Sequence, residues 1–372
     1  MKIGIDCRLA GTQHAGIGRY IENLIIRLPK LSPGTKWVYF FYDQDQAQTV
    51  LQKLTSAQQQ NIHVKLAAIK HYSLAEQIQL VKIFHQAQLD LLHIPHFNAP
   101  IFYPGKLVIT IHDLLWHQQK GLTVTTLPKW QYWLKYLAYR LVATTAIYRA
   151  SKILVPAATI KKTLLSYYPQ VKNKIIVTKE GVSQEFHLKP TQAHPLTKQL
   201  LYVGSLYPHK NIKLVLQALT QLPDYQLILV GARNVFQQQV KKQVKHLQLA
   251  DQVKFTGYLS DAQLIKLYQQ SLALIQPSLS EGFGLTGVEA MAAGVPVLAS
   301  KIPIFQEIYQ DAALYFNPYA VDELVQTIKQ VSKTRLRKKL INQGQKLAQQ
   351  YSWQQLTEQT WQSYQSVLNL KS

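Results

Sequence analysis

The feature that most constrains the fold of this chain is a regular alternation of short apolar runs with segments of helical periodicity. The runs are rich in Val, Ile, Leu and Tyr and have the length of β-strands. Strands that are apolar on both faces need cover on both faces, which a parallel sheet flanked by helices provides. We therefore predict an α/β fold. The expected strands are residues 2–7, 37–42, 62–67, 89–94, 107–111, 153–155, 175–177, 200–203, 226–230, 253–255, 272–275, 295–298 and 313–315.

The series of strands is interrupted once. Residues 188–198 contain two prolines and no periodicity, which is typical of a linker. A length of 372 residues also suggests two domains. We expect an N-terminal domain over 1–187, a C-terminal domain over 199–351, and a final helix over 352–372 for which Ser352 is a suitable N-cap.

The charge points to a polyanionic partner. The formal net charge is +22, and residues 1–181 hold 22 Lys and Arg against 8 Asp and Glu. Nucleic acid, an anionic membrane and phosphate-bearing substrates all fit this excess. Cys7 is the only cysteine, and no charge-free apolar run reaches the ~18 residues needed to span a bilayer. We expect a cytoplasmic protein in a reducing compartment, peripheral on the inner face of the cell membrane.

Residues 276–300 carry the clearest chemistry. Glu281 and Glu289 bracket the turn Gly282-Phe283-Gly284, which precedes a helical segment that begins near Leu285. Free N–H groups at a helix start attract phosphate, and carboxylates accept hydrogen bonds from sugar hydroxyls. Phosphate together with a polyol predicts a nucleotide sugar.

The same glycines match a dinucleotide fingerprint. Gly282, Gly284 and Gly287 have the G-x-G-x-x-G spacing of an NAD site. That motif follows the first strand of its unit, and the next strand ends in an acid that holds the ribose. Here the next strand ends in Ser300-Lys301. We therefore reject the NAD interpretation.

A lysine follows the first strand of the second domain. Lys210 comes after Gly204-Ser205, and Asn211 is placed to cap the helix that begins at Ile212. A cation beside a helix start suits a diphosphate whose leaving charge has to be stabilised. The alternative is a solvated surface lysine, and the strand, turn and cap pattern favours the functional role.

One tripeptide raises the question of a metal site. Asp43-Gln44-Asp45 resembles the D-x-D signature of metal-dependent glycosyltransferases, but aspartates at a strand end are commonly turn formers and caps. We expect no metal there.

Four histidines cluster in the first domain. Their spacing fits no standard zinc motif. We expect His112, at the end of a strand, to be a hydrogen-bonding or proton-handling group in the ligand crevice, with structural or surface roles for the other three. The four are His93, His96, His112 and His117.

Residues 127–141 combine aromatic side chains with cations. An interfacial helix on an anionic membrane and a core helix both have this composition. Stacking of nucleic-acid bases is a third alternative, but no recognised binding motif accompanies it. We favour contact with the membrane or acceptor through Lys129, Trp130, Trp133, Lys135 and Arg140.

With these motifs in place, the chain resembles the family-4 glycosyltransferases, and among them mannosyltransferase-like enzymes of polysaccharide assembly. The matching segments cover nearly its whole length; they are residues 16–20, 110–113, 174–182, 204–211, 281–285 and 289–296. The resemblance implies the GT-B fold. In that fold two Rossmann-like domains face each other across a cleft, and a C-terminal helix crosses back onto the first domain.

The resemblance also implies roles for individual residues. Glu289 would bind the donor ribose, and Lys210 the diphosphate. Glu281, with the backbone N–H groups of residues 283–285, would hold the transferred sugar and its phosphates. Gly16 and Gly18 would form a first-domain loop that closes on the phosphates. His112, Glu281 and Lys210 would be the catalytic residues.

One position departs from the family pattern. Many members have an arginine where this chain has Ser205, which removes one contact to the donor diphosphate. Arg19 and Arg233 are candidates to replace it. Ser205 occurs in relatives that resemble mannosyltransferases, which tilts the expected donor towards them.

The expected function is transfer of a hexose, with retention and without an obligatory metal or cofactor, from a GDP- or UDP-linked sugar. The acceptor would be a glycan or polyprenyl-linked glycan of a surface polysaccharide. A nucleotide-sugar epimerase or hydrolase and a non-catalytic partner protein are the alternatives. Specific binding of nucleic acid is not expected.

Overall fold

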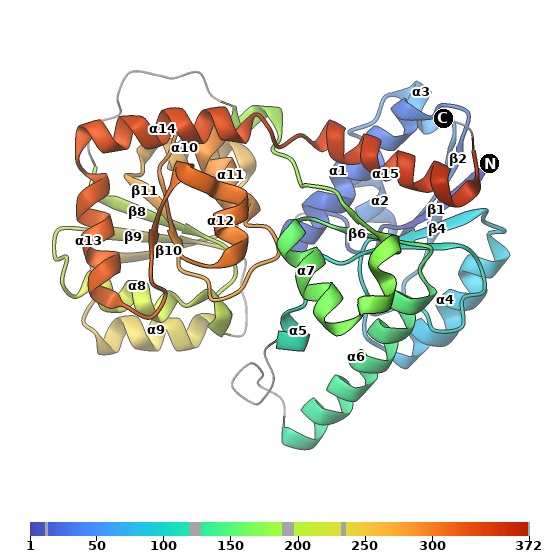
Figure 1. Ribbon diagram of the computed structural model, residues 1–372, viewed down its shortest axis with the longest axis horizontal. Coiled ribbons are helices and arrows are strands. Elements are labelled where there is room, and N and C mark those ends of the chain that lie inside the picture. Colours follow the sequence, from blue (N-terminus) through green and yellow to red (C-terminus); the bar gives the residue numbers. More distant parts are fainter. Residues whose placement is uncertain (12–13, 119–127, 188–196, 232–235, 371–372) are drawn as a thin grey trace. The chain divides into compact units, whose positions relative to one another are not determined.

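A computed structural model describes residues 1–11, 14–118, 128–187, 197–231 and 236–370 (Figure 1). The chain divides into two compact units. The described residues up to Glu180, together with those from Trp353 onwards, form the first unit, and Gly181–Ser352 lies in the second. The division falls after Glu180 rather than at His187, because Val182 donates a hydrogen bond to the carbonyl of Tyr351 within the second unit. Most of the expected linker, 188–196, lies outside the described residues.

The first unit is a seven-stranded parallel sheet in the order β3-β2-β1-β4-β5-β6-β7. Its strands are β1 (Lys2–Asp6), β2 (Lys36–Phe41), β3 (Ile62–Leu66), β4 (Leu91–Ile94), β5 (Leu107–Thr110), β6 (Lys152–Val155) and β7 (Ile175–Val177). Its helices are α1 (Ala15–Leu31), α2 (Gln44–Leu51), α3 (Ser56–Gln59), α4 (Leu74–Gln86), α5 (Leu115–Gln118), α6 (Lys129–Arg149), α7 (Ala158–Tyr167), the 3₁₀ segment Pro169–Lys174 and α15 (Trp353–Leu368).

The second unit is a six-stranded parallel sheet in the order β10-β9-β8-β11-β12-β13. Its strands are β8 (Gln199–Val203), β9 (Gln226–Val230), β10 (Val253–Gly257), β11 (Ala273–Gln276), β12 (Val297–Ser300) and β13 (Ala313–Phe316). Its helices are α8 (Ile212–Leu219), α9 (Gln237–His246), α10 (Asp261–Gln270), α11 (Leu285–Ala292), α12 (Pro303–Tyr309), α13 (Val321–Val331), α14 (Thr334–Ala348) and the 3₁₀ segments Gln184–Phe186, Pro208–Lys210 and Gln310–Ala312.

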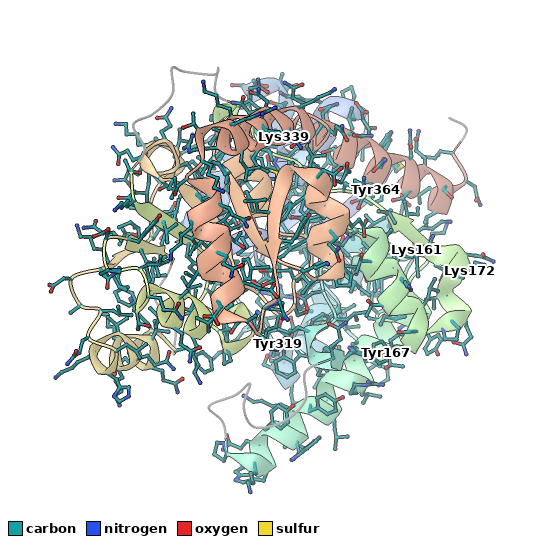
Figure 2. The ribbon with its side chains drawn as sticks, turned by 60° about the vertical axis from the view of Figure 1, so that its left-hand side comes forward. Lys161, Tyr167, Lys172, Tyr319, Lys339 and Tyr364 are labelled. Atoms are coloured by element: carbon teal, nitrogen blue, oxygen red, sulfur yellow. The ribbon has the colours of Figure 1, made fainter. Side chains whose placement is uncertain are left out.

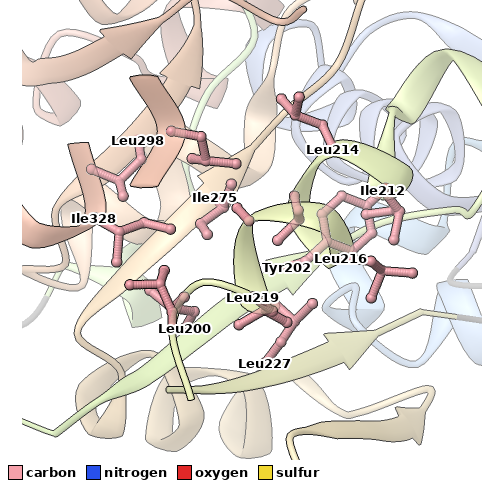
Figure 3. Close-up of a cluster of buried hydrophobic side chains, with 14 of the residues drawn as sticks. Leu200, Tyr202, Ile212, Leu214, Leu216, Leu219, Leu227, Ile275, Leu298 and Ile328 are labelled. Atoms are coloured by element: carbon pink, nitrogen blue, oxygen red, sulfur yellow. The ribbon is translucent and has the colours of Figure 1, made fainter. Parts of the chain in front are cut away.

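The core of each unit explains why the strands were recognisable in the sequence. Every residue of β4, β5, β11 and β12 is buried, so these strands are mostly apolar and show no alternation of apolar with polar residues. Figure 3 shows side chains of the sheet in the second unit packed against those of α8 and α13, among them Leu200, Ile275, Leu298, Leu219 and Ile328. Each predicted strand is present, with ends within two residues of those expected.

The last helix belongs to the first unit, as the resemblance implied. α15 packs beside α1, and Tyr364 of α15 is fully buried there (Figure 2). The hydroxyl of Tyr364 lies 2.5 Å from Nδ1 of His93 in β4. The chain therefore forms the second unit and then returns to complete the first.

One helix begins earlier than expected. α1 starts at Ala15, so Gly16 and Gly18 lie in its first turns and not in a loop. An added Cβ at Gly18 would lie 1.9 Å from the carbonyl oxygen of Gly11. Glycine is needed at position 18 because two backbone segments approach closely, whereas at Gly16 no atom lies within 4 Å of an added Cβ.

Candidate functional site

The strands of the two sheets follow the same order, except that the seven-stranded sheet has one more strand at its end. In each sheet the direction in which successive strands are added reverses at one place. The reversal lies between β1 and β4 in the first unit and between β8 and β11 in the second. In open α/β sheets ligands bind outside the carboxyl ends of the strands at this switch point. Both switch points carry buried or half-buried charged side chains.

At the second switch point Lys210 meets Glu281. Nζ of Lys210 lies 2.5 Å from Oε1 of Glu281, and the hydroxyl of Ser278 donates to the same oxygen at 2.8 Å. Burial alone would raise the pKa of Glu281, but the charge of Lys210 and the two hydrogen bonds outweigh burial and hold that pKa below its ordinary value. Both side chains keep partial exposure, 18% and 17%, so this ion pair is accessible at its edge.

Sequence reasoning missed two neighbours of this pair. Ser278 was not singled out, although it follows β11 directly. The carbonyl of His209 accepts the N–H of Leu279 at 2.7 Å, which ties the Lys210 loop to the Glu281 loop. Burial, and then the charge of Lys210, lower the pKa of His209 to about 4, so its ring is neutral at pH 7.

The glycine turn is held by a buried tyrosine. The hydroxyl of Tyr309 donates to the carbonyl of Gly284 at 2.6 Å, and Gly284 has a φ of +91°. An added Cβ would lie 2.2 Å from the Tyr309 hydroxyl oxygen at Gly284 and 2.3 Å from it at Gly287. The fingerprint glycines therefore allow α11 to pack on Tyr309, which supports rejecting an NAD site. At the start of α11 the N–H of Gly287 donates to the carbonyl of Gly284 at 3.0 Å, and the N–H groups before it in the first turn can meet an anion.

The other residues of the second unit that were expected to bind the donor differ in exposure. Glu289 in α11 is 2% exposed, and Phe283 packs on Tyr351 with ring centroids 5.5 Å apart. Gly282 and Leu285 are half-buried. The roles expected for these residues stay predictions.

The loop after β8 contains one wrong prediction. Asn211 occupies the N-cap position of α8 in a left-handed conformation (φ 55°), but its side chain makes no cap. Its amide instead donates to the carbonyl of Pro318 at 2.8 Å. Ser205 lies in the same loop, and its carbonyl accepts the hydroxyl of Tyr202. Arg233 lies outside the described residues.

In the first unit, His112 follows β5 and has acceptors at both ring nitrogens. Nδ1 lies 3.2 Å from Oε1 of Glu180, and Nε2 lies 3.2 Å from the carbonyl oxygen of Pro95. The ring packs edge-on against Tyr20 with centroids 4.7 Å apart. Because a carboxylate and a carbonyl only accept hydrogen bonds, both contacts are satisfied together when the ring is protonated.

The other three histidines are buried or half-buried, and the structural or surface roles expected for them stay predictions. His93 is fully buried, and its Nε2 lies 2.9 Å from the hydroxyl of Thr110. Both ring nitrogens of His117 contact tyrosine hydroxyls, those of Tyr139 and Tyr168. His96 is half-buried, and burial followed by the charge of His112 lowers its pKa to about 3.

Asp43 is a helix cap, as expected for the D-x-D match. Its side chain accepts the N–H of Gln46 at 2.8 Å at the start of α2. Among the residues that the structure describes, no group of three or more His, Cys, Asp or Glu is arranged to hold a metal ion.

The first switch point holds an ion cluster that sequence reasoning missed. Arg8, just after β1, contacts Asp6 at 2.7 Å and Glu76 at 2.8 Å. These side chains are between 1% and 5% exposed. Burial alone would raise the pKa values of both carboxyls. The contact with His71 and the charge of Arg8 hold the pKa of Glu76 below its ordinary value, and Arg8 followed by His71 does the same for Asp6. Asp6 and Arg8 lie two residues apart at the end of a strand, and Glu76 lies 68 residues after Arg8. No sequence motif therefore identified this cluster.

The aromatic helix α6 has one side buried in the core and one side exposed. Tyr132, Tyr136 and Ile147 are buried on one side. Trp130, Trp133, Leu134, Leu137 and Leu141 are between 48% and 68% exposed. In the described part of the chain, no helix is both long and apolar enough to cross a membrane.

Two family models match the chain in succession. The model "Glycosyltransferase Family 4" matches residues 14–186, and "Glycosyl transferases group 1" matches 183–347. A similar curated protein is O-antigen chain mannosyltransferase RfbU of Salmonella typhimurium, 30% identical over 218 residues, which are 57% of this chain and 61% of that protein. O-antigen chain mannosyltransferase B of Escherichia coli is 31% identical over 207 residues, 52% of this chain and 54% of that protein. The matches thus span between half and two thirds of these relatives.

Solved structures share the fold over nearly the full length. Sucrose-phosphate synthase from Thermosynechococcus elongatus has a TM-score of 0.78 and 18% identity, with 99% of each chain covered. HepE of Anabaena, in complex with UDP and glucose, has a TM-score of 0.76 and 18% identity, covering 98% of this chain and 100% of that one. The lipopolysaccharide glycosyltransferase WaaG has a TM-score of 0.72 at 14% identity, with 97% and 98% covered. The two α/β units therefore have the GT-B fold.

Proposed function

The chain belongs to the glycosyltransferases, with a family 4 domain followed by a group 1 domain, and from this premise we propose that it transfers a hexose from a nucleotide sugar to a growing glycan in surface polysaccharide biosynthesis. The observation that carries the proposal is the Lys210–Glu281 pair at the ends of β8 and β11, beside the start of α11. Similarity to O-antigen mannosyltransferases favours mannose as the sugar. We expect the donor to be GDP- or UDP-linked.

The proposed chemistry uses fixed charges and needs no metal. Lys210 neutralises the charge that develops on the leaving diphosphate, aided by the first N–H groups of α11. Glu281, kept ionised by Lys210 and Ser278, accepts hydrogen bonds from hydroxyls of the transferred sugar. Glu289 binds the ribose, and the family resemblance supports retention at the anomeric carbon. His112 holds or moves a proton on the acceptor side, in the first unit.

The test of this proposal is donor binding and turnover. A ligand that binds only the folded state raises the unfolding temperature by mass action. We expect GDP or UDP to raise it, and GDP- or UDP-hexoses to release nucleotide in EDTA when a glycan acceptor is present. Turnover without any acceptor would identify an epimerase or hydrolase. Failure of every nucleotide to stabilise the protein would refute the proposal.

We also propose that α6 rests on an anionic membrane surface that carries a lipid-linked acceptor. Its exposed side chains Trp130, Trp133, Leu134, Leu137 and Leu141 repeat at helical spacing. Residues 114–179 contain no acid and eleven cations, among them Lys129, Lys135, Arg140 and the exposed Lys172 (Figure 2). Apolar side chains edged with cations favour an interface with anionic lipid, at ~1 kcal/mol for each cation near the surface.

Vesicle sedimentation tests the membrane contact. The protein should sediment with phosphatidylglycerol vesicles more than with phosphatidylcholine vesicles, and less so at high salt. Replacing Trp130 and Trp133 by serine should reduce sedimentation about tenfold, whereas the same change at the exposed Trp116 should not. If the variant with serine at both Trp130 and Trp133 sediments as strongly as the variant with serine at Trp116, α6 does not contact the membrane.

A further inference from the structure

Tyr72 has an unusual combination of backbone and exposure. It is 66% exposed, and its φ is 61°. Bulky residues rarely adopt this left-handed conformation, and where they do the surrounding structure has to impose it. Strained residues of this kind are concentrated at ligand-binding sites.

The strain at Tyr72 is imposed by the ion cluster at the first switch point. The N–H of Tyr72 donates to Oε2 of Glu76 at 2.8 Å. Arg8 contacts Glu76 at 2.8 Å and donates to the carbonyl of Ile69 at 3.0 Å, so it holds the turn on both sides of Tyr72. The side chain of Asn98 donates to Glu76 as well. A fully buried network thus fixes the position of an exposed ring.

The ring of Tyr72 extends an aromatic surface that reaches towards His112. Its hydroxyl lies 3.4 Å from Nε2 of His96, and its ring centroid lies 5.9 Å from that of His96 and 6.4 Å from that of Phe97. The low pKa of His96, about 3, keeps that ring uncharged at neutral pH. Pro95, the residue before His96, accepts the contact from His112.

We propose that Tyr72 binds a hexopyranose ring of the acceptor glycan, stacked on its exposed aromatic face. A pyranose has an apolar C–H face with hydroxyls at its rim, which fits an uncharged aromatic ring with a polar edge. The site is at the carboxyl ends of β1 and β4, where ligands of such sheets bind. This inference rests on the proposed glycosyl transfer, for which it names the acceptor contact.

Substitutions at Tyr72 separate the ring from the backbone strain. Asparagine and glycine both tolerate positive φ, so Tyr72→Asn and Tyr72→Gly remove the ring without adding strain. Tyr72→Phe keeps the ring and removes the hydroxyl. Tyr167→Asn is the control, because Tyr167 is an exposed tyrosine on α7 of the same unit (Figure 2).

The measurement is binding of methyl α-mannoside, α-glucoside and α-galactoside by saturation-transfer NMR. We expect the protein to bind at least one, Tyr72→Phe and Tyr167→Asn to bind it equally well, and Tyr72→Asn and Tyr72→Gly to bind it about 5- to 10-fold more weakly. The proposal is overturned if the unaltered protein binds none of them, or if both ring-less variants bind as well as it does.

Nucleotide binding is measured on the same samples, so that the two proposals can fail separately. Stabilisation by GDP or UDP should be equal in the unaltered protein and in Tyr72→Asn, which also shows that the variant is folded. Hexoside binding that depends on Tyr72, in a protein stabilised by no nucleotide, would sustain the saccharide site and refute the donor. Stabilisation by a nucleotide without binding of any hexoside would sustain the nucleotide-sugar donor and refute the saccharide site.

Discussion

The two switch points of this molecule hold the same chemistry at different depths. In the first unit Arg8 contacts Asp6 and Glu76, with all three side chains at most 5% exposed. In the second unit Lys210 contacts Glu281, with both side chains close to one fifth exposed. Arginine has a planar group with several fixed donors, whereas lysine has a compact charge on a flexible stem.

The difference in depth fits a structural role for the first cluster and the proposed ligand-binding role for the second. Every contact of Arg8 described above is internal and helps to hold the Tyr72 turn. In the proposed function Lys210 leaves Glu281 for the donor phosphate, which fits a pair with one edge facing water. Substitutions should therefore affect stability in the first unit and activity in the second.

Arg8→Met should give the largest effect. Two buried carboxylates would lose the guanidinium that pairs with both, although Glu76 keeps its contacts to His71, Tyr72 and Asn98, and this loss costs ~3–5 kcal/mol of unfolding free energy. The free energy is obtained from urea denaturation followed by circular dichroism. Lys82→Met, at an exposed position of α4, should change it by less than ~0.5 kcal/mol. A small loss for Arg8→Met would show that the cluster is not a structural brace.

Lys210→Met should lower activity strongly and stability only slightly. Loss of one fixed donor to developing charge costs ~2.7–4 kcal/mol in catalysis, a fall of about 100- to 1000-fold in kcat. Stability should change by less than ~1 kcal/mol, because the pair is partly solvated. Initial rates with the donor that stabilises the protein provide the measurement, and Lys213→Met, exposed on α8, is the matched control. Normal activity in Lys210→Met would contradict the assignment.

Acid should weaken the first unit over a wide pH window. Burial lowers the folded-state pKa of His93 and of His96 to about 3. The unfolded chain binds protons from about pH 6.5 downwards, while the folded chain does not, so stability is lost as the pH falls from 6.5 towards 3. Each histidine contributes up to ~1.4 kcal/mol per pH unit.

In the second unit burial lowers the pKa of His209 to about 4 and also lowers the pKa of His187, so the pH window over which His209 destabilises the fold is narrower than that of His93 or His96. Urea denaturation at a series of pH values measures how steeply the unfolding free energy of each unit falls with falling pH. His93→Gln should make this dependence less steep in the first unit. An unchanged slope in His93→Gln would mean that other groups cause the acid sensitivity.

Two glycines of α1 should give the smallest effects, with opposite signs. Gly18→Ala forces a Cβ to within 1.9 Å of a backbone oxygen, which should destabilise the first unit by ~1–3 kcal/mol. Gly16→Ala meets no atom within 4 Å and should stabilise the helix by up to ~1 kcal/mol. Thermal unfolding distinguishes them. If Gly16→Ala lowers activity without lowering stability, Gly16 has the phosphate-closing role expected from the sequence.

Much of the fold could be predicted because buried parallel strands leave a direct signal in the sequence. Each apolar run became a strand, and the terminal helix after Ser352 formed where expected. Local rules failed where a tertiary contact overrode them. Asn211 turned its side chain to Pro318 and left the cap unmade, and α1 began four residues before the expected start at Arg19.

The sequence by itself determined the α/β class and the two-unit order, because these depend on the periodicity of the apolar residues. Only the tertiary structure decided which charges are buried. Arg8 and Glu76 are 68 residues apart, and Lys210 and Glu281 are 71 apart. The depth of each pair depends on packing around its strand end, and a linear pattern does not encode that packing.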